Sequence, residues 1–313
     1  FLILPTRNLC GIRTGLFNYL NNFKNNKIMS NYKLATNALH AGHDTTTNGG
    51  TRAVPIYQTS SYVFNDTEHA ANLFSLKELG FIYTRLNNPT NQILQDRLAA
   101  VEGGIGAVVF ASGTAAISTG LLTLLKAGDH IVASSSLYGG TFNLLNVTLP
   151  RFGITTTFVD ASDPENFGKA VQENTRAFFV ESLGNPKLDV LDLKAISKES
   201  KAAGVPFIVD NTVATPSLLN PIEHGANLVI HSLTKYIGGQ GTSLGGAIID
   251  AGTFDWTNGK FPEFTEPSAG YHGLVYSEAL GAAAFTFKLI LEGLRDFGGA
   301  LSPFNAFQII QGL

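Results

Sequence analysis

The sequence predicts an α/β fold in which a mainly parallel sheet is covered by helices on both faces. Short runs of apolar, often β-branched residues recur along the chain, and each run ends in polar residues. Segments with helical patterning lie between these runs. Strands that are apolar on both faces and alternate with helices are typical of a parallel sheet buried between two helical layers.

Seven runs fit this description of a buried strand. They are AVVF (107–110), IVAS (131–134), TTTFVD (155–160), AFFVES (177–182), PFIVDN (206–211), LVIHS (228–232) and GGAIID (245–250). The expected helices lie near 114–126, 140–149, 163–172 and 191–203. Residues 103–125 carry no charge and are numerous enough to cross a membrane, but their glycines and hydroxyl residues favour a strand, a turn and a buried helix.

The composition excludes several classes of protein. Of 313 residues, 44% are apolar and 14% are charged, which is typical of a globular protein and too sparse in charge for a coiled coil. The net charge of −3 argues against a nucleic-acid surface. The single cysteine, Cys10, excludes an internal disulfide, and the scattered histidines do not predict a metal site.

Both ends of the chain differ from its middle. Residues 1–28 contain four basic and no acidic residues before the single methionine, Met29. This fits a non-native, disordered leader better than a transit peptide, and the lack of an apolar core with a cleavage site predicts a cytoplasmic protein. Residues 301–313 read as the opening of a helix with Ser302-Pro303 at its start, so we expect a truncated reading frame.

Nucleotide-binding fingerprints are missing from the sequence. No G-x-G-x-x-G follows the first expected strand, and no G-x-x-x-x-G-K-[ST] occurs. A Rossmann dinucleotide site and a P-loop are therefore not expected.

An anion site is expected instead at the carboxyl ends of the strands, where parallel sheets bind ligands. Ser112-Gly113-Thr114 lies where a strand turns into a helix, so free backbone N–H groups and the helix dipole favour a phosphate there. The hydroxyls of Ser232 and Thr234 follow a later strand and can also bind phosphate oxygens.

Three further strand-end residues complete the pattern of a pyridoxal phosphate (PLP) site. Tyr138 offers a flat ring, Asp210 a carboxylate for a pyridinium nitrogen, and Lys235 an amine for a Schiff base. Each residue alone has an ordinary structural explanation. Their order on successive strand ends predicts PLP as the cofactor.

From Asn31 onward the sequence resembles the PLP-dependent cystathionine γ-synthase-like family of Cys/Met metabolism, and within it the O-acetylhomoserine sulfhydrylases. The matching motifs are AVPIYQTSSYVF (53–64), IYTRLNNPTN (82–91), EGG (102–104), SGTAA (112–116), LYGGT (137–141), ESLGNP (181–186), VDNTVATP (209–216), HSLTKYIGGQGTSLGG (231–246) and FTEPSAGYHGLVY (264–276).

The resemblance implies an aspartate-aminotransferase-like (type I) fold with a mainly parallel seven-stranded sheet. It implies an N-terminal arm at 29–85, a large PLP-binding domain at 86–280 and the start of a truncated C-terminal domain at 281–313. The assembly it implies is a homotetramer of active dimers, without a nucleic-acid or membrane partner.

The resemblance also implies roles for individual residues. Lys235 aligns with the Schiff-base lysine, Asp210 with the pyridinium partner and Asn185 with the residue facing the ring hydroxyl. Tyr138 aligns with the stacking ring and is expected to assist proton transfer. The positions expected to bind phosphate are Ser112, Gly113, Thr114, Ser232 and Thr234, together with Tyr83 and Arg85, which are expected to reach the phosphate of the neighbouring subunit.

The activity implied is that of a PLP-dependent transferase of methionine and cysteine biosynthesis. It would replace the acetate group at Cγ of O-acetyl-L-homoserine by sulfide, giving L-homocysteine and acetate. Cystathionine γ-synthase and methionine γ-lyase activities are alternatives, as is a non-catalytic metabolite-binding role. Gly140, where methionine γ-lyases usually have cysteine, and the segment FTEPSAGYHG favour a sulfhydrylase. The choice of O-acetyl or O-succinyl donor, and of sulfide or methanethiol, stays open.

Overall fold

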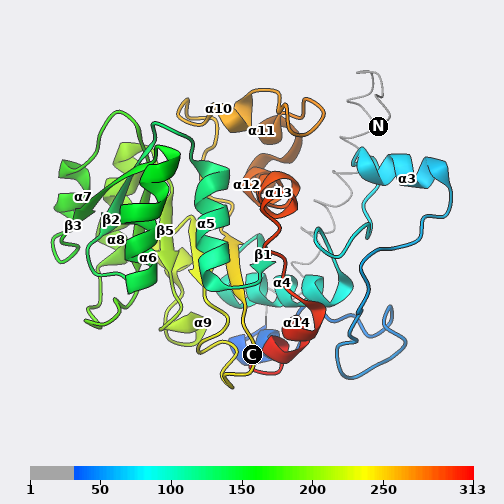
Figure 1. Cartoon of the computed structure of the whole chain (residues 1–313). Helices are drawn as coiled ribbons and strands as arrows, with labels where there is room; N and C mark the ends of the chain where they lie inside the picture. Colours follow the sequence, from blue (N-terminus) through cyan, green and yellow to red (C-terminus); the bar gives the residue numbers. More distant parts are fainter. Residues whose placement is uncertain (1–31) are drawn as a thin grey trace.

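The computed structural model describes residues 32–313, so the expected leader and Cys10 lie outside the described residues. A seven-stranded sheet runs through the centre of the molecule in the order β1-β7-β6-β5-β4-β2-β3 (Figure 1). The strands are β1 Gly106–Phe110, β2 His130–Ser134, β3 Thr155–Val159, β4 Thr175–Glu181, β5 Phe207–Asp210, β6 Leu228–His231 and β7 Gly246–Asp250. All seven predicted strands are confirmed.

The sheet is mainly parallel, as predicted, and β7 is the exception. This strand runs antiparallel to both of its neighbours, β1 and β6, whereas the other neighbouring pairs are parallel. Consequently Asp250, at the end of β7, pairs with Leu228 at the beginning of β6. The segment after β7 therefore starts at the edge opposite to the carboxyl ends of the parallel strands.

Helices cover both faces of the sheet. They are α2 Leu34–His40, α3 Thr67–Phe74, α4 Pro89–Glu102, α5 Gly113–Leu124, α6 Gly139–Asn143, α7 Glu165–Lys169, α8 Leu193–Ala203, α9 Thr215–Leu218, α10 Pro262–Thr265, α11 Tyr276–Leu280, α12 Ala284–Lys288, α13 Arg295–Phe297 and α14 Pro303–Ile310. The helix expected over 140–149 keeps α-helical geometry only in α6. It continues as π-helical turns over Leu144–Thr148 and a 3₁₀ turn that contains Pro150, which has no N–H to donate.

Adjacent residues of each strand point into two different cores. Phe179 of β4 belongs to the same buried cluster as Ile131 and the apolar residues of α5, whereas its neighbour Phe178 belongs to the cluster that contains Val132 and the apolar residues of α4. This alternation follows from the pleat of the strands and explains why both faces had to be apolar. β3, one of the two edge strands, differs from the others: Thr155 is exposed, and Thr156 and Thr157 are only partly buried.

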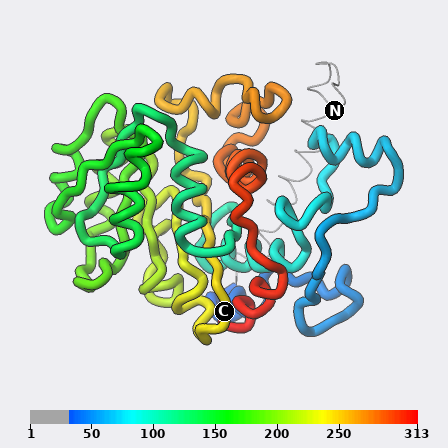
Figure 2. Tube along the Cα trace, in the orientation of Figure 1, coloured from blue at the N-terminus to red at the C-terminus, as the bar shows by residue number. Residues whose placement is uncertain are grey.

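The stretch 103–125 forms β1, a turn and α5, as predicted. Within residues 32–313, no helix has both the length and the apolar character that crossing a membrane requires. The helix predicted at the end of the chain is α14, whose Ile309 shares a core with Leu94 of α4. Figure 2 shows the end of the chain beside the yellow loop that follows β6, where Gly312 packs against Gly238.

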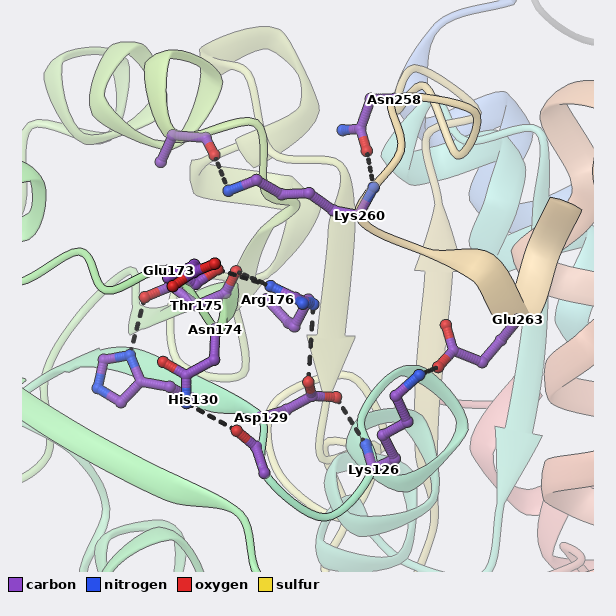
Figure 3. A network of polar contacts seen from close by, with 12 residues as sticks. Lys126, Asp129, His130, Glu173, Asn174, Thr175, Arg176, Asn258, Lys260 and Glu263 are labelled. Atoms are coloured by element: carbon purple, nitrogen blue, oxygen red, sulfur yellow. Dashed lines mark hydrogen bonds and ion pairs between the residues drawn. The ribbon is translucent and has the colours of Figure 1, made fainter.

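A polar network closes the edge of the sheet at which the parallel strands begin (Figure 3). Asp129 accepts a hydrogen bond from the backbone of Lys126 (2.8 Å) and lies 3.6 Å from Arg176 at the start of β4. The side chain of Lys126 forms an ion pair with Glu263 of α10. These contacts fix the segment after β7 to β2 and β4 at this edge. The opposite edge, where the parallel strands end, is not covered by this network.

Asp250 allows a test of this arrangement. Its buried carboxylate accepts hydrogen bonds from Gly252 N and Thr286 Oγ1, yet burial raises its pKa to about 6. Because the folded state binds this proton more tightly than the unfolded state does, its contribution to stability is complete below about pH 4 and is lost as pH rises through 6. We expect Asp250→Asn to remove this loss, which amounts to up to about 3 kcal/mol, in urea unfolding measured from pH 4 to 8.

Asp255 is the matched control for Asp250. It is a solvent-exposed acid whose pKa is lowered by hydrogen bonds from the side chain and backbone of Thr257. Its stabilising effect is lost only as pH falls below about 4, so between pH 4 and 8 Asp255→Asn should keep the pH dependence of the wild type, whereas Asp250→Asn removes it. Identical pH profiles for the two variants would contradict the prediction.

Candidate active site

The strand-end residues are connected by one series of contacts, which begins where α5 starts. Gly113 lies against Ser232, because a Cβ atom at position 113 would be 2.7 Å from the Cβ of Ser232. Ser112 stands before it, and its hydroxyl caps α5 by accepting from Ala115 N (3.1 Å). A side chain at position 113 would separate the beginning of α5 from the end of β6, so only glycine permits this approach.

The series continues from β6 to β5 through a single hydroxyl. Ser232 N donates to Thr212 Oγ1 (2.8 Å), and Thr212 Oγ1 donates in turn to Asp210 Oδ1 (2.5 Å). Thr212 N also donates to Asp210 Oδ1 (3.0 Å). The carboxylate at the end of β5 is therefore held at a fixed place beside Ser232 and the start of α5.

From Asp210 the series crosses to β4. Asp210 pairs with Glu181 in the register of the two parallel strands, so two carboxylates end neighbouring strands. Glu181 Oε1 accepts from Tyr138 N (2.6 Å) and Oε2 accepts from Asn185 N (3.2 Å). Glu181 thereby joins the end of β4 to the loops that carry Tyr138 and Asn185.

The two acids are buried, and their pKa values reflect it. Burial and the adjacent Asp210 raise the pKa of Glu181 to about 8, against the hydrogen bonds from the two amides. Burial also raises the pKa of Asp210, against its hydrogen bonds from Thr212. Two neighbouring carboxylates disfavour each other's negative charge, so this place in the fold favours a cation.

Other predicted site residues surround this series. Tyr138, at the start of α6, has 54% of its surface exposed, and Asn185 and Lys235 are exposed as well. Lys235 lies in the turn after β6, where its own backbone N–H donates to Ser232 O (3.2 Å). Tyr138, Asn185 and Lys235 thus project from three different strand ends that face the same edge of the sheet.

Two predicted phosphate positions have different contacts. Thr114 is exposed in the first turn of α5. The hydroxyl of Thr234 donates to Gly245 O (3.2 Å) and accepts from Gly245 N (3.1 Å), so it closes the glycine-rich loop between β6 and β7. The phosphate roles of these residues stay predictions.

Tyr83 and Arg85 lie between α3 and α4 and are not part of the series. The guanidinium of Arg85 lies over the ring of Tyr83, 5.3 Å from its centroid, and donates to Arg295 O (2.5 Å). Within residues 32–313 their described contacts link the arm to α13 and not to the strand ends.

Comparison with known proteins identifies the family. The profile of the family described as Cys/Met metabolism PLP-dependent enzyme matches residues 35–313. The chain belongs to this family. It is 56% identical over 291 residues to O-acetyl-L-homoserine sulfhydrylase of Leptospira meyeri, and 50% identical over 278 residues to homocysteine synthase of Schizosaccharomyces pombe. These alignments cover 90% and 88% of this chain but 66% and 65% of the relatives, so the chain spans just under two thirds of their length.

A solved structure agrees with the family assignment. A Campylobacter jejuni protein described as an O-acetylhomoserine (thiol)-lyase superposes with a TM-score of 0.87 and 41% identity, over 90% of this chain and 70% of that one. That protein carries N'-pyridoxyl-lysine-5'-monophosphate at one lysine position. The predicted type I fold and PLP-dependent class are thereby confirmed.

The residues at these strand ends fit the cofactor named in the description of the family. Both hydrogen bonds that Asp210 accepts within the described residues go to Oδ1, so Oδ2 is available to a protonated ring nitrogen. The start of α5 supplies backbone N–H groups for a phosphate beside Ser232. No group of His, Cys, Asp and Glu side chains in residues 32–313 is arranged to hold a metal ion.

The sequence pattern missed two residues that organise this site. Glu181 was recognisable only as a strand end, because its partners lie 43 and 4 residues away in other loops. Thr212 was unmarked, although a hydroxyl two residues after a strand-end aspartate is a common local hydrogen-bond partner. His231 of β6 and Glu102 of α4 form a further pair, which is fully buried and hydrogen-bonded.

Gly113 provides a test of the close approach of α5 to β6. We expect Gly113→Ala to destabilise the protein by about 1–3 kcal/mol, because its Cβ would overlap Ser232. Gly139→Ala is the matched control: Gly139 also begins a helix, but nothing lies within 4 Å of its added Cβ. Equal stability of the two variants in urea unfolding would contradict the packing described here.

Proposed function

We propose that the protein catalyses the replacement of the acetate group at Cγ of O-acetyl-L-homoserine by sulfide, giving L-homocysteine and acetate. The observation that carries this proposal is the series Gly113, Ser232, Thr212, Asp210 and Glu181, which gathers an anion site, a carboxylate, an aromatic ring and a lysine at one edge. The names of the relatives from Leptospira meyeri and Schizosaccharomyces pombe support the choice of reaction.

In this proposal PLP, when bound through Lys235, supplies an electron sink that stabilises negative charge on the substrate carbons near the amino group. Asp210 keeps the ring nitrogen protonated, and Tyr138 stacks on the ring. The amide of Asn185 faces the ring hydroxyl. Ser112, Gly113, Thr114, Ser232 and Thr234 hold the phosphate.

The side-chain amine of Lys235 moves the protons. Once released by the incoming amino acid, it takes the proton from Cα and then a proton from Cβ. Acetate leaves Cγ with the electron pair of its C–O bond, hydrosulfide forms the new C–S bond at Cγ, and the protons return to Cβ and Cα. Tyr138, at the same edge, assists these transfers.

A methionine γ-lyase activity is less well supported than the replacement reaction. The ring of Tyr138 lies directly on Gly140, since a Cβ there would be 2.5 Å from Tyr138 Cε1. A cysteine at this position would require the ring to move. A cystathionine γ-synthase activity differs only in its thiol acceptor, and the assay below separates it.

Lys235→Ala tests the proposed reaction. With PLP, O-acetyl-L-homoserine and sulfide, we expect the wild type to form homocysteine in large excess over 2-oxobutyrate. The variant should lose at least about 10³-fold in rate, because it has neither the Schiff-base amine nor the base. Lys194→Ala, on the exposed side of α8, is the control and should leave the rate unchanged. Mainly 2-oxobutyrate, or a reaction only with cysteine, would contradict the sulfhydrylase proposal.

We further propose a cytoplasmic homotetramer of active dimers, in which Tyr83 and Arg85 bind the phosphate of the neighbouring subunit. The proposed domains are the arm 29–85, the large domain 86–280 and the start of a C-terminal domain at 281–313. An arginine on the arm can bind a phosphate with two parallel hydrogen bonds, which a lysine cannot do.

Mixed assemblies test this sharing of the site. Arg85→Ala and Lys235→Ala subunits should each be inactive alone. Unfolded together and refolded in equal amounts, they should recover about a quarter of wild-type activity, because half of the dimers then contain one intact site. Activity no higher than the sum of the two separate variants would show that Arg85 serves its own chain.

A further inference from the structure

Glu181 connects the loop that follows β2 with the loop that follows β4. It ends β4, and only 5% of its surface is exposed. One carboxylate oxygen accepts from the amide of Tyr138, which follows β2, and the other accepts from the amide of Asn185, four residues further along its own chain. The two oxygens therefore serve two different loops.

Both loops carry a side chain that the proposed function places on the cofactor ring. The ring of Tyr138 is half-exposed, and the side chain of Asn185 is exposed, so neither is fixed by burial. Their backbone amides, in contrast, end on the same buried carboxylate. The positions of the two side chains relative to each other consequently depend on Glu181.

A second contact braces the same pair of loops. Ser136 Oγ, before Tyr138, donates to Asp189 Oδ1 (2.7 Å), after Asn185. Gly184 allows this contact, because a Cβ at that position would be 2.3 Å from both of these oxygens. The brace holds the loops together away from the ring, while Glu181 holds them at the strand end beside Asp210.

We propose that Glu181 is a positioning residue that sets the spacing between Tyr138 and Asn185 at the cofactor site. This inference rests on the proposed function. A carboxylate suits this role because it accepts two N–H groups at once in fixed directions. Burial beside Asp210 raises the pKa of Glu181 to about 8, and its two oxygens nevertheless accept from both amides.

Two substitutions separate this role from a general effect on folding. Glu181→Gln keeps the shape but turns an NH₂ group toward one of the two amides, and Glu181→Asp keeps the carboxyl group but is one methylene too short to reach both. We expect the dissociation constant for PLP, titrated into the apo protein, to rise at least about 10-fold in both variants. The circular dichroism of the bound cofactor should fall in parallel.

Asp250→Asn is the matched control. Asp250 is also a buried strand-end acid with a raised pKa and a backbone N–H partner, but it lies at the opposite edge of the sheet. It should leave the PLP dissociation constant and the circular dichroism unchanged. Unchanged PLP binding in the Glu181 variants, or equal weakening in the control, would overturn the inference. If the wild type itself binds no PLP, the proposed function fails instead, and the inference fails with it.

Amide hydrogen exchange on the wild type needs no variant and decides the case if the Glu181 variants do not fold. The N–H groups of Tyr138 and Asn185 should exchange at least about 100-fold more slowly than in an unstructured peptide, because each is held by Glu181. Both should be slower than the amide of Gly139, which is exposed beside them. Unprotected amides at both positions would overturn the inference.

Discussion

The hydroxyl of Thr212 is the contact on which the candidate site depends. It accepts from Ser232 N and donates to Asp210 Oδ1, so it fixes the ends of β5 and β6 relative to each other. Parallel strands bring their carboxyl ends to one edge, but they do not by themselves fix the spacing of the side chains there. A short hydrogen-bonded link between neighbouring strand ends supplies that spacing. The packing of Gly113 on Ser232 then places the start of α5 in the same frame.

The ends of β4 and β5 bring two acidic side chains together in a buried place. Glu181 and Asp210 are neighbours in the sheet register, and burial raises the pKa of each. An uncompensated pair of buried carboxylates is unfavourable, and a cation at the same edge offsets that cost. The family cofactor would bring such a cation in its protonated ring nitrogen. The electrostatics of the sheet edge and the chemistry of the family cofactor thus agree.

The strands and most of the site were predictable because their signals are local. Each strand is an apolar run, and Asp210 and Lys235 stand directly beyond such runs. The role of Glu181 was not predictable, since one of its partners, Tyr138, is 43 residues away and is bound through its backbone, which leaves no mark in the sequence. The break after α6 was missed for a related reason: Leu144–Thr148 has ordinary helical composition, and its π-helical geometry is set by packing.

The arm shows how one residue can serve two contacts. Arg85 lies over Tyr83 and donates one N–H to the backbone carbonyl of Arg295 in α13. The guanidinium of Arg295 in turn lies over the ring of Tyr271. Tyr271 donates to Phe74 O of α3, so the segment after β7 and the arm support each other. A guanidinium carries five N–H donors in a fixed plane, and the Arg295 carbonyl occupies one of them. The contact within the chain therefore orients Arg85 without using up its capacity to bind a phosphate, which is the condition that a residue serving a neighbouring subunit must meet.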